Sequence, residues 1–128
     1  MKFGIEDAES NVPCIYLPIE AFANARGIEY PKLRKGLGLE KMALPDMGED
    51  AATMAANALI KLFEQGDLNP KEIGRIYLGT ESALDGAKPT ATYAVEMLEM
   101  FLEEKHGPNC LEHADVTDMT FACIGAID

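Results

Sequence analysis

Two side chains suited to acid–base or nucleophilic chemistry stand out in the sequence, Glu81 and Cys123. Glu81 belongs to a Gly-Thr-Glu-Ser segment that directly follows an apolar, strand-like run. Ligands of α/β sheets gather at the carboxyl ends of strands, so a partly desolvated glutamate at this place is suited to general acid or base chemistry. The structural alternative is a solvated loop carboxylate or an acid near the start of a helix.

Cys123 lies in a Phe-Ala-Cys-Ile-Gly segment close to the last residue of the chain. If a helix begins at this cysteine, its first amides would stabilise a thiolate, and neighbouring N–H groups could form an oxyanion hole. The alternative is a buried core thiol, because an Ala-Cys pair in an apolar run is usually buried. We interpret the other two cysteines, Cys14 and Cys110, as structural.

The charge balance restricts the classes of partner. The chain has 22 acidic residues against 11 Lys and Arg, which gives a formal net charge of −11. Such a field repels phosphate backbones and anionic bilayers, so we expect neither nucleic acid nor a membrane as partner. An anionic ligand needs a local basic patch, and the densest one consists of Lys32, Arg34, Lys35 and Lys41. A solvated face is the alternative for this patch.

Several other signals are missing. The three cysteines have neither the spacing of zinc ligands nor the even number of a disulfide framework, so we expect no metal site. No charged-then-apolar leader precedes them, and no apolar run approaches the length of a membrane span, which favours a reduced, cytoplasmic setting. His106 and His113 fit solvated or capping positions, so the sequence offers no convincing histidine base.

The elements that must position Glu81 and Cys123 follow from periodicity and stop signals. Apolar residues recur at helical spacing after the acids at 46–50 and again along 91–105, and each run ends at a glycine. A β-rich run at 73–80 predicts a strand covered on both faces, and 111–117 is a weaker strand candidate. Shorter elements complete the prediction: an extended entry at 13–18, a helix at 19–25 and a helical turn at 32–38.

The alternation of strand, helix and strand predicts an α/β layered fold with at least partly parallel strands. A length of 128 residues fits one domain, and 48% hydrophobic residues suffice for a core. The last residues carry no turn or capping signal, so we expect residues 1–128 to be a single partial domain that is cut after Cys123.

Six ordered segments resemble the hydroxymethylglutaryl-CoA synthase family of the thiolase superfamily. The resemblance extends from residue 3 to 125, and each segment alone is weak. Together they have the order and intervals of the family. They are Ala-Arg-Gly-Ile at 25–28, Lys-Gly-Leu-Gly-Leu-Glu-Lys-Met at 35–42, Thr-Met-Ala-Ala-Asn-Ala at 53–58, Ile-Gly-Arg-Ile-Tyr-Leu-Gly-Thr-Glu-Ser at 73–82, Asp-Gly-Ala-Lys at 85–88 and Phe-Ala-Cys at 121–123.

The resemblance implies an incomplete amino-terminal half of a thiolase-like layered α/β/α fold and an acyltransferase of the mevalonate pathway for isoprenoids. In such a synthase Cys123 would accept an acetyl group from acetyl-CoA, and Glu81 would remove a methyl proton for condensation with acetoacetyl-CoA. Lys32, just before the Gly-Leu-Gly segment, would contact coenzyme A. These CoA thioesters are substrates, and no permanently bound cofactor is implied.

The sequence also departs from the family pattern. Ile124 stands where an aromatic residue usually follows the cysteine, and the family's catalytic histidine lies in a portion beyond residue 128. We therefore expect the chain to be inactive alone and to act as a homo-oligomer or with a complementary carboxy-terminal chain. The divergent segment before Asp118 favours a bacterial or archaeal type. Two alternatives remain, a condensing enzyme like ketoacyl carrier-protein synthase III and a non-catalytic scaffold that kept the fold.

Overall fold

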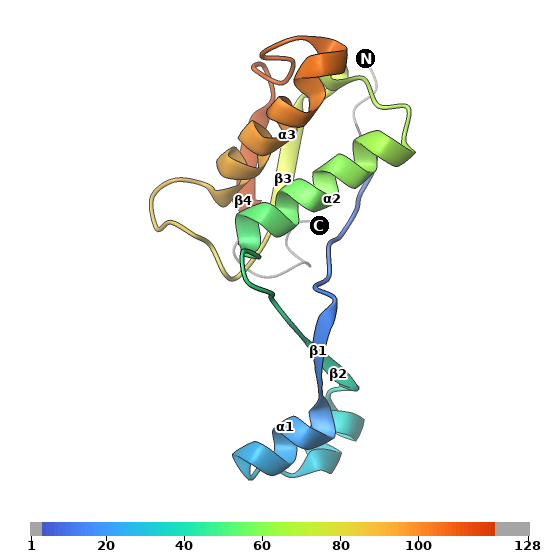
Figure 1. The fold of residues 1–128 in the computed structure, drawn as a ribbon, viewed down its shortest axis with the longest axis vertical. Coiled ribbons are helices and arrows are strands. Elements are labelled where there is room, and N and C mark those ends of the chain that lie inside the picture. The colour runs from blue at the N-terminus through green and yellow to red at the C-terminus, as the bar shows by residue number, and fades with distance from the viewer. Residues whose placement is uncertain (1–3, 120–128) are drawn as a thin grey trace. The chain divides into compact units, whose positions relative to one another are not determined.

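The computed structural model describes residues 4–119, which form two compact units. The hairpin unit is Val12–Glu49, and the sheet unit consists of the described residues 4–11 and 50–119. Figure 1 shows the elements of both along the chain.

The hairpin unit is built on two antiparallel strands, β1 (Ile15–Pro18) and β2 (Lys41–Leu44). Between them lie helix α1 (Ile19–Arg26) and a π-helical turn, η1 (Lys32–Gly36). The helix and the turn confirm the prediction, with Gly27 closing α1 at a positive φ of 64°. The sequence did not predict β2, because Lys, Met, Ala and Leu are strong helix formers and four residues are too few for periodicity to override them.

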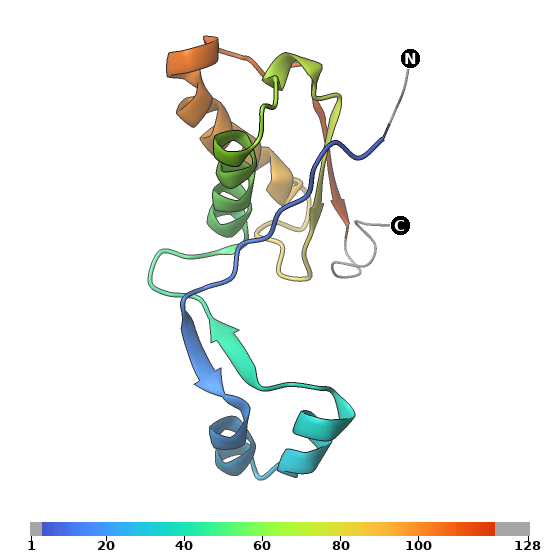
Figure 2. The same ribbon diagram turned by 90° about the vertical axis from the view of Figure 1, so that its right-hand side faces the viewer.

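The sheet unit has the predicted strand, helix and strand alternation. Helix α2 (Ala51–Gln65) leads through a 3-10 turn, η2 (Pro70–Glu72), to β3 (Arg75–Gly79), and α3 (Thr90–His106) connects β3 to β4 (Asp115–Met119). The two strands pair in parallel, as a crossover through a helix requires. Both helices lie on one side of the strand pair (Figure 2).

Helix α2 begins at a capping box. The Thr53 amide donates to Asp50 Oδ1 at 2.8 Å, and the Asp50 amide donates to Thr53 Oγ1 at 2.8 Å. The hydrogen bond from the Thr53 amide holds the pKa of Asp50 below its ordinary value. The helix ends at Gly66, where a Cβ would lie 2.9 Å from the Leu62 carbonyl oxygen, so a larger residue would force the chain apart.

The core of the sheet unit lies between the two helices and the strands. Buried alanines, Ala55 and Ala56 on α2 and Ala94 on α3, form one cluster against Leu78 of β3. Small side chains let the backbones approach closely, as expected of the alanine-rich face of α2. A second cluster consists of Leu98, Leu102, Cys110 and Leu111, packed against partly buried residues of α2 and α3.

Two expectations for the strands are wrong. Ile76 is buried against the helices, but Tyr77 is 52% exposed on the opposite face, so β3 is covered on one face rather than on both. A strand directs successive side chains to opposite faces, and the Tyr77 hydroxyl accepts a hydrogen bond from Arg75 at 3.4 Å. Strand β4 begins at Asp115 rather than at 111, because Leu111 is buried in the helix core and its amide donates to Glu99 at 2.9 Å.

Leu98 offers a test of this core because its side chain is fully buried, at 0% exposure. We expect Leu98→Ala to lower the free energy of unfolding by about 2–5 kcal/mol, since the deletion leaves a cavity. The matched control is Met100→Ala on the same helix, whose side chain is 73% exposed. Urea unfolding followed by circular dichroism measures both. Equal losses in the two variants would contradict the assigned core.

Candidate active site at the carboxyl ends of two parallel strands

The two predicted catalytic positions follow the carboxyl ends of β3 and β4. The last register pair of the strands is Gly79 with Met119, and the Thr80 amide extends the ladder by donating to the Met119 carbonyl at 3.2 Å. Glu81 comes two residues after β3. Cys123 comes four residues after Met119 and lies outside the described residues. Parallel pairing thus places the last described residue before Cys123, Met119, beside Gly79, from which the Glu81 loop begins.

The loop that carries Glu81, residues 80–89, is held by short-range hydrogen bonds. The Ser82 amide donates to Thr80 Oγ1 at 3.0 Å, and the Leu84 amide donates to Thr90 Oγ1 at 3.2 Å. The Glu81 side chain itself is exposed, whereas the sequence suggested a partly desolvated carboxylate. The backbone around Glu81 is therefore anchored while its carboxylate faces solvent.

The second half of the loop is organised by Asp85. Its carboxylate accepts a hydrogen bond from the Ala87 amide at 2.8 Å, and this bond is the main cause that lowers the pKa of Asp85. The ammonium of Lys88 lies 3.9 Å from the ring centroid of Tyr93 on α3. The Asp-Gly-Ala-Lys segment at 85–88 thus folds the loop back onto the helix that follows it.

Asp118 was not assigned a role by the sequence, yet it joins β4 to α3. Its carboxylate accepts hydrogen bonds from the first two amides of the helix, those of Thr90 and Ala91, the latter at 2.9 Å. Anionic side chains are favoured at helix amino termini, where amides lack carbonyl partners. One feature of the sequence could have indicated this role. Asp118 lies two residues after Val116, so the two side chains are on the same face of the strand.

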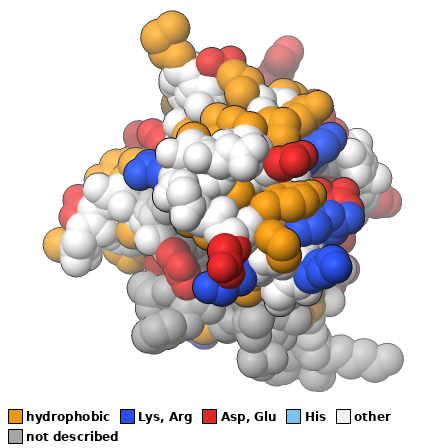
Figure 3. Space-filling view, turned by 90° about the horizontal axis from the view of Figure 1, so that it is seen from below, with side chains coloured by type: hydrophobic (Ala, Val, Ile, Leu, Met, Phe, Trp, Pro, Cys, Tyr) orange, Lys and Arg blue, Asp and Glu red, His pale blue; other side chains and the backbone are white. Residues whose placement is uncertain are grey.

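The predicted basic patch belongs to the hairpin unit and is largely paired. Lys32 Nζ lies 3.2 Å from Glu29 Oε2, Arg34 pairs with Glu40, and Lys41 Nζ lies 4.1 Å from the Tyr16 ring centroid. Basic side chains lie among acidic and apolar ones on the face seen in Figure 3. The Lys32 pair is exposed on both sides, so it is a weak contact that another anion can replace.

The two described cysteines differ sharply. Cys110 is buried at 3% exposure, and burial raises the pKa of its thiol, which confirms the interpretation as a structural residue. Cys14 is exposed, so it is not part of the core.

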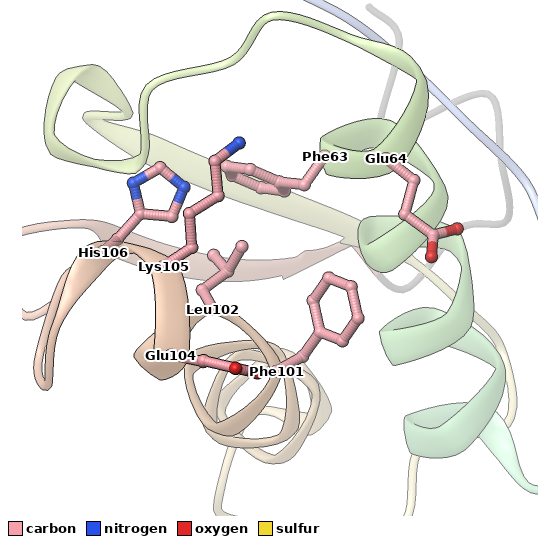
Figure 4. A pocket seen from close by; sticks show the side chains of 7 residues that line it. All are labelled: Phe63, Glu64, Phe101, Leu102, Glu104, Lys105 and His106. Carbon is pink, nitrogen blue, oxygen red and sulfur yellow. The ribbon is translucent and has the colours of Figure 1, made fainter.

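A hollow of about 500 Å³ lies elsewhere, at the carboxyl-terminal ends of α2 and α3. Figure 4 shows the rings of Phe63 and Phe101 with Lys105 and His106 around it. The loop of Glu81 precedes the opposite, amino-terminal end of α3. His106 therefore does not supply a base to the candidate site within the sheet unit.

Two further properties concern residues 4–119. No group of three or more His, Cys, Asp or Glu side chains in this range is arranged to hold a metal ion. Over the same range, none of the helices combines the length and apolar character that crossing a bilayer demands.

Comparison with known proteins places this arrangement in a family. The family model described as "Hydroxymethylglutaryl-coenzyme A synthase N terminal" matches residues 1–128. The hydroxymethylglutaryl-CoA synthase of Haloferax volcanii is 42% identical over 103 residues, which cover 80% of this chain and 22% of the relative. That of Methanocella arvoryzae is 34% identical over 123 residues, covering 96% of this chain and 32% of the relative.

Solved structures agree. MvaS in complex with 3-hydroxy-3-methylglutaryl coenzyme A superposes with a TM-score of 0.70 and 35% identity, over 93% of this chain and 26% of that one. The expected thiolase-type fold is confirmed, with this chain corresponding to its amino-terminal part. The chain spans about a fifth to a third of the length of these curated relatives. It belongs to the hydroxymethylglutaryl-CoA synthase family.

Proposed function

We propose that this chain supplies the nucleophile and the acid/base of a synthase that condenses acetyl-CoA with acetoacetyl-CoA. One observation carries the proposal: parallel pairing ends β3 and β4 at the same edge, so Glu81 and the segment that leads to Cys123 start from neighbouring residues. A carboxylate and a thiol that begin at one sheet edge fit a two-step acyl transfer and condensation.

The chemistry begins with attack of Cys123 Sγ on the carbonyl carbon of acetyl-CoA. A C–S bond to the enzyme forms, the bond to coenzyme A breaks, and coenzyme A leaves as a thiol with the proton of the cysteine. Glu81 then removes a methyl proton from the acetyl group, and the carbanion attacks the carbonyl carbon of the ketone of acetoacetyl-CoA. The ketone oxygen becomes a hydroxyl by taking up the proton that Glu81 carries, which restores the carboxylate. Water finally hydrolyses the enzyme thioester and regenerates Cys123.

The anchored loop suits Glu81 to this role. Proton removal from a thioester methyl group is slow without a positioned base, and the exposed carboxylate is open to a substrate that arrives from solvent. Further groups of the site, the base that assists Cys123 among them, would come from other residues of the synthase. A complementary carboxy-terminal chain can supply them.

Lys32 is proposed as a contact for a phosphate of coenzyme A. Its present partner, Glu29, forms an exposed pair at 3.2 Å, and such pairs contribute little stability. A doubly charged phosphate would compete well for the ammonium. Since the whole chain repels anions, a small local basic cluster is the place where a CoA thioester would gain attraction.

The acetyl-transfer step predicts a covalent adduct. After incubation of the chain, combined with the complementary carboxy-terminal chain, with acetyl-CoA, we expect one acetyl group on the peptide that contains Cys123, detected by mass spectrometry, and none in Cys123→Ala. Cys14→Ala should retain the adduct, because Cys14 is the exposed control thiol. Cys110 should stay unlabelled, since burial raises its pKa. A folded protein without label at Cys123 would count against acyl transfer.

The condensation step predicts a separate defect in Glu81→Gln. This variant should keep the acetyl group on Cys123 but lose condensation with acetoacetyl-CoA by about 10²–10⁴-fold, the usual contribution of a positioned acid or base. Single-turnover formation of product measures the loss. An unchanged rate would favour a synthase that does not use this glutamate, and absence of any reaction in the parent protein would favour a scaffold.

The coenzyme A contact predicts opposite effects for the two members of one ion pair. We expect Lys32→Ala to raise the dissociation constant for coenzyme A by about twofold to fivefold, the range typical of an exposed charge pair. Glu29→Gln should leave binding unchanged or tighten it, because it removes the competing carboxylate. Titration calorimetry at low salt measures both, and equal weakening in the two variants would exclude a direct role for Lys32.

A further inference from the structure

We propose that Asp118 and Thr90 are positioning residues that hold the Glu81 loop against the carboxyl end of β4. The inference rests on the proposed function in one respect, the role of Glu81 as acid/base. It adds two residues to which neither the family pattern nor the sequence assigned a task. Thr90 acts through the loop backbone and Asp118 through the first amides of α3, and neither is placed in contact with substrate.

The first contact in this arrangement is made by the carboxylate of Asp118 on β4. Asp118 lies one residue before the end of β4 and accepts hydrogen bonds from the Thr90 and Ala91 amides, 28 and 27 residues away in sequence. These amides would otherwise be unpaired at the helix amino terminus, and a negative charge there is stabilised by the helix dipole. The contact therefore ties the start of α3 to the strand that leads toward Cys123.

The second link is a buried hydroxyl. Thr90 has 0% exposure, and its Oγ1 accepts a hydrogen bond from the Leu84 amide at 3.2 Å. Leu84 is three residues from Glu81 within the same loop. A buried hydroxyl retained at a helix start needs a partner, and here the partner is the loop backbone. Asp118, Thr90 and Leu84 thus form a chain of contacts from β4 to the loop.

The loop is also held on the other side of Glu81. The Thr80 amide bonds to the Met119 carbonyl at 3.2 Å, next to Asp118 in sequence. Glu81 is therefore bracketed by two attachments, and both lead to the last two residues of β4. Within residues 4–119 the Glu81 side chain itself makes no hydrogen bond or ion pair. Its direction hence depends on the backbone that the two attachments hold, and a general base has to stay within hydrogen-bond reach of its proton.

The first experiment removes the hydroxyl without changing the shape of the side chain. In Thr90→Val we expect the Leu84 amide to exchange with solvent deuterium about tenfold faster, the loss of one hydrogen bond, while the Leu98 amide in the same helix keeps its rate. Thr90→Ser restores the acceptor and should return Leu84 to its original rate. Equal acceleration at Leu84 and Leu98 would overturn the proposal, because it would mean general destabilisation, and so would an unchanged Leu84.

The second experiment connects the loop to Glu81. In the protein acetylated at Cys123, uptake of solvent deuterium into the acetyl methyl group reports proton removal, and Glu81→Gln should abolish it. Thr90→Val and Asp118→Asn should slow uptake about tenfold at an unchanged extent of acetylation, and Thr90→Ser should restore it. Normal uptake in Thr90→Val would overturn the positioning role.

Failure of the proposed function gives a different pattern. If the acetyl group never forms, or if Glu81→Gln leaves deuterium uptake unchanged, the assigned chemistry is wrong and the catalytic purpose of Asp118 and Thr90 falls with it. Exchange at Leu84 would still decide whether the two residues hold the loop. The two experiments thus separate a wrong function from a wrong positioning device.

Discussion

The parallel pairing of β3 with β4 is the constraint on which the rest of the sheet unit depends. Parallel neighbours cannot be joined by a tight turn, so helix α3 has to carry the chain back along the strands before β4 begins. The crossover brings Gly79 beside Met119, so the carboxyl ends of the two strands lie at one edge of the pair.

Packing between α2 and α3 determines how closely the helices can approach this strand pair. The side chains at this contact are small, namely those of Ala55, Ala56 and Ala94, and Leu78 of β3 packs against them. The larger residues, Leu98 and Leu102, lie further along α3 and join Cys110 and Leu111. The helices therefore approach the strands most closely near the carboxyl ends of the strands. The cluster of larger side chains fills the space at the opposite end of the unit.

Much of this arrangement follows from sequence patterns, and the misses have physical causes. The long helices carry strong periodicity and end at glycines, so α2 and α3 were predictable to within a residue or two, and the order of six short segments indicated the family. Strand β2 was missed because a four-residue strand of helix formers has no period to detect. The start of β4 was misplaced because Leu111 has a strand-like pattern but is buried in a turn against the helices.

The place of Glu81 directly after an apolar strand followed from the sequence, and its catalytic role stays a prediction. Its exposure depends on how the loop folds, which no pattern in the sequence indicates. The role of Asp118 could not be predicted, because its partners are the backbone amides of Thr90 and Ala91. Nearly every residue has such an amide, so the sequence does not indicate which ones a side chain will bind. Contacts between a side chain and a distant backbone are the class of interaction that single-sequence reasoning finds hardest to anticipate.

On the solvent face of the strand pair, Arg75 and Asp115 occupy directly opposite register positions and are joined by a 2.9 Å contact. Because successive residues of a strand rise by about 3.3 Å, a slip of two residues would displace Gly79 from Met119 by roughly 7 Å while keeping each apolar side chain on its proper face. Hydrophobicity alone cannot reject that slipped state. The Arg75–Asp115 pair forms only in the observed alignment, so it adds a small preference for that register, of the size typical of an exposed ion pair. The hydrogen bonds that Asp118 accepts from the first amides of α3 favour the same alignment from the helix side.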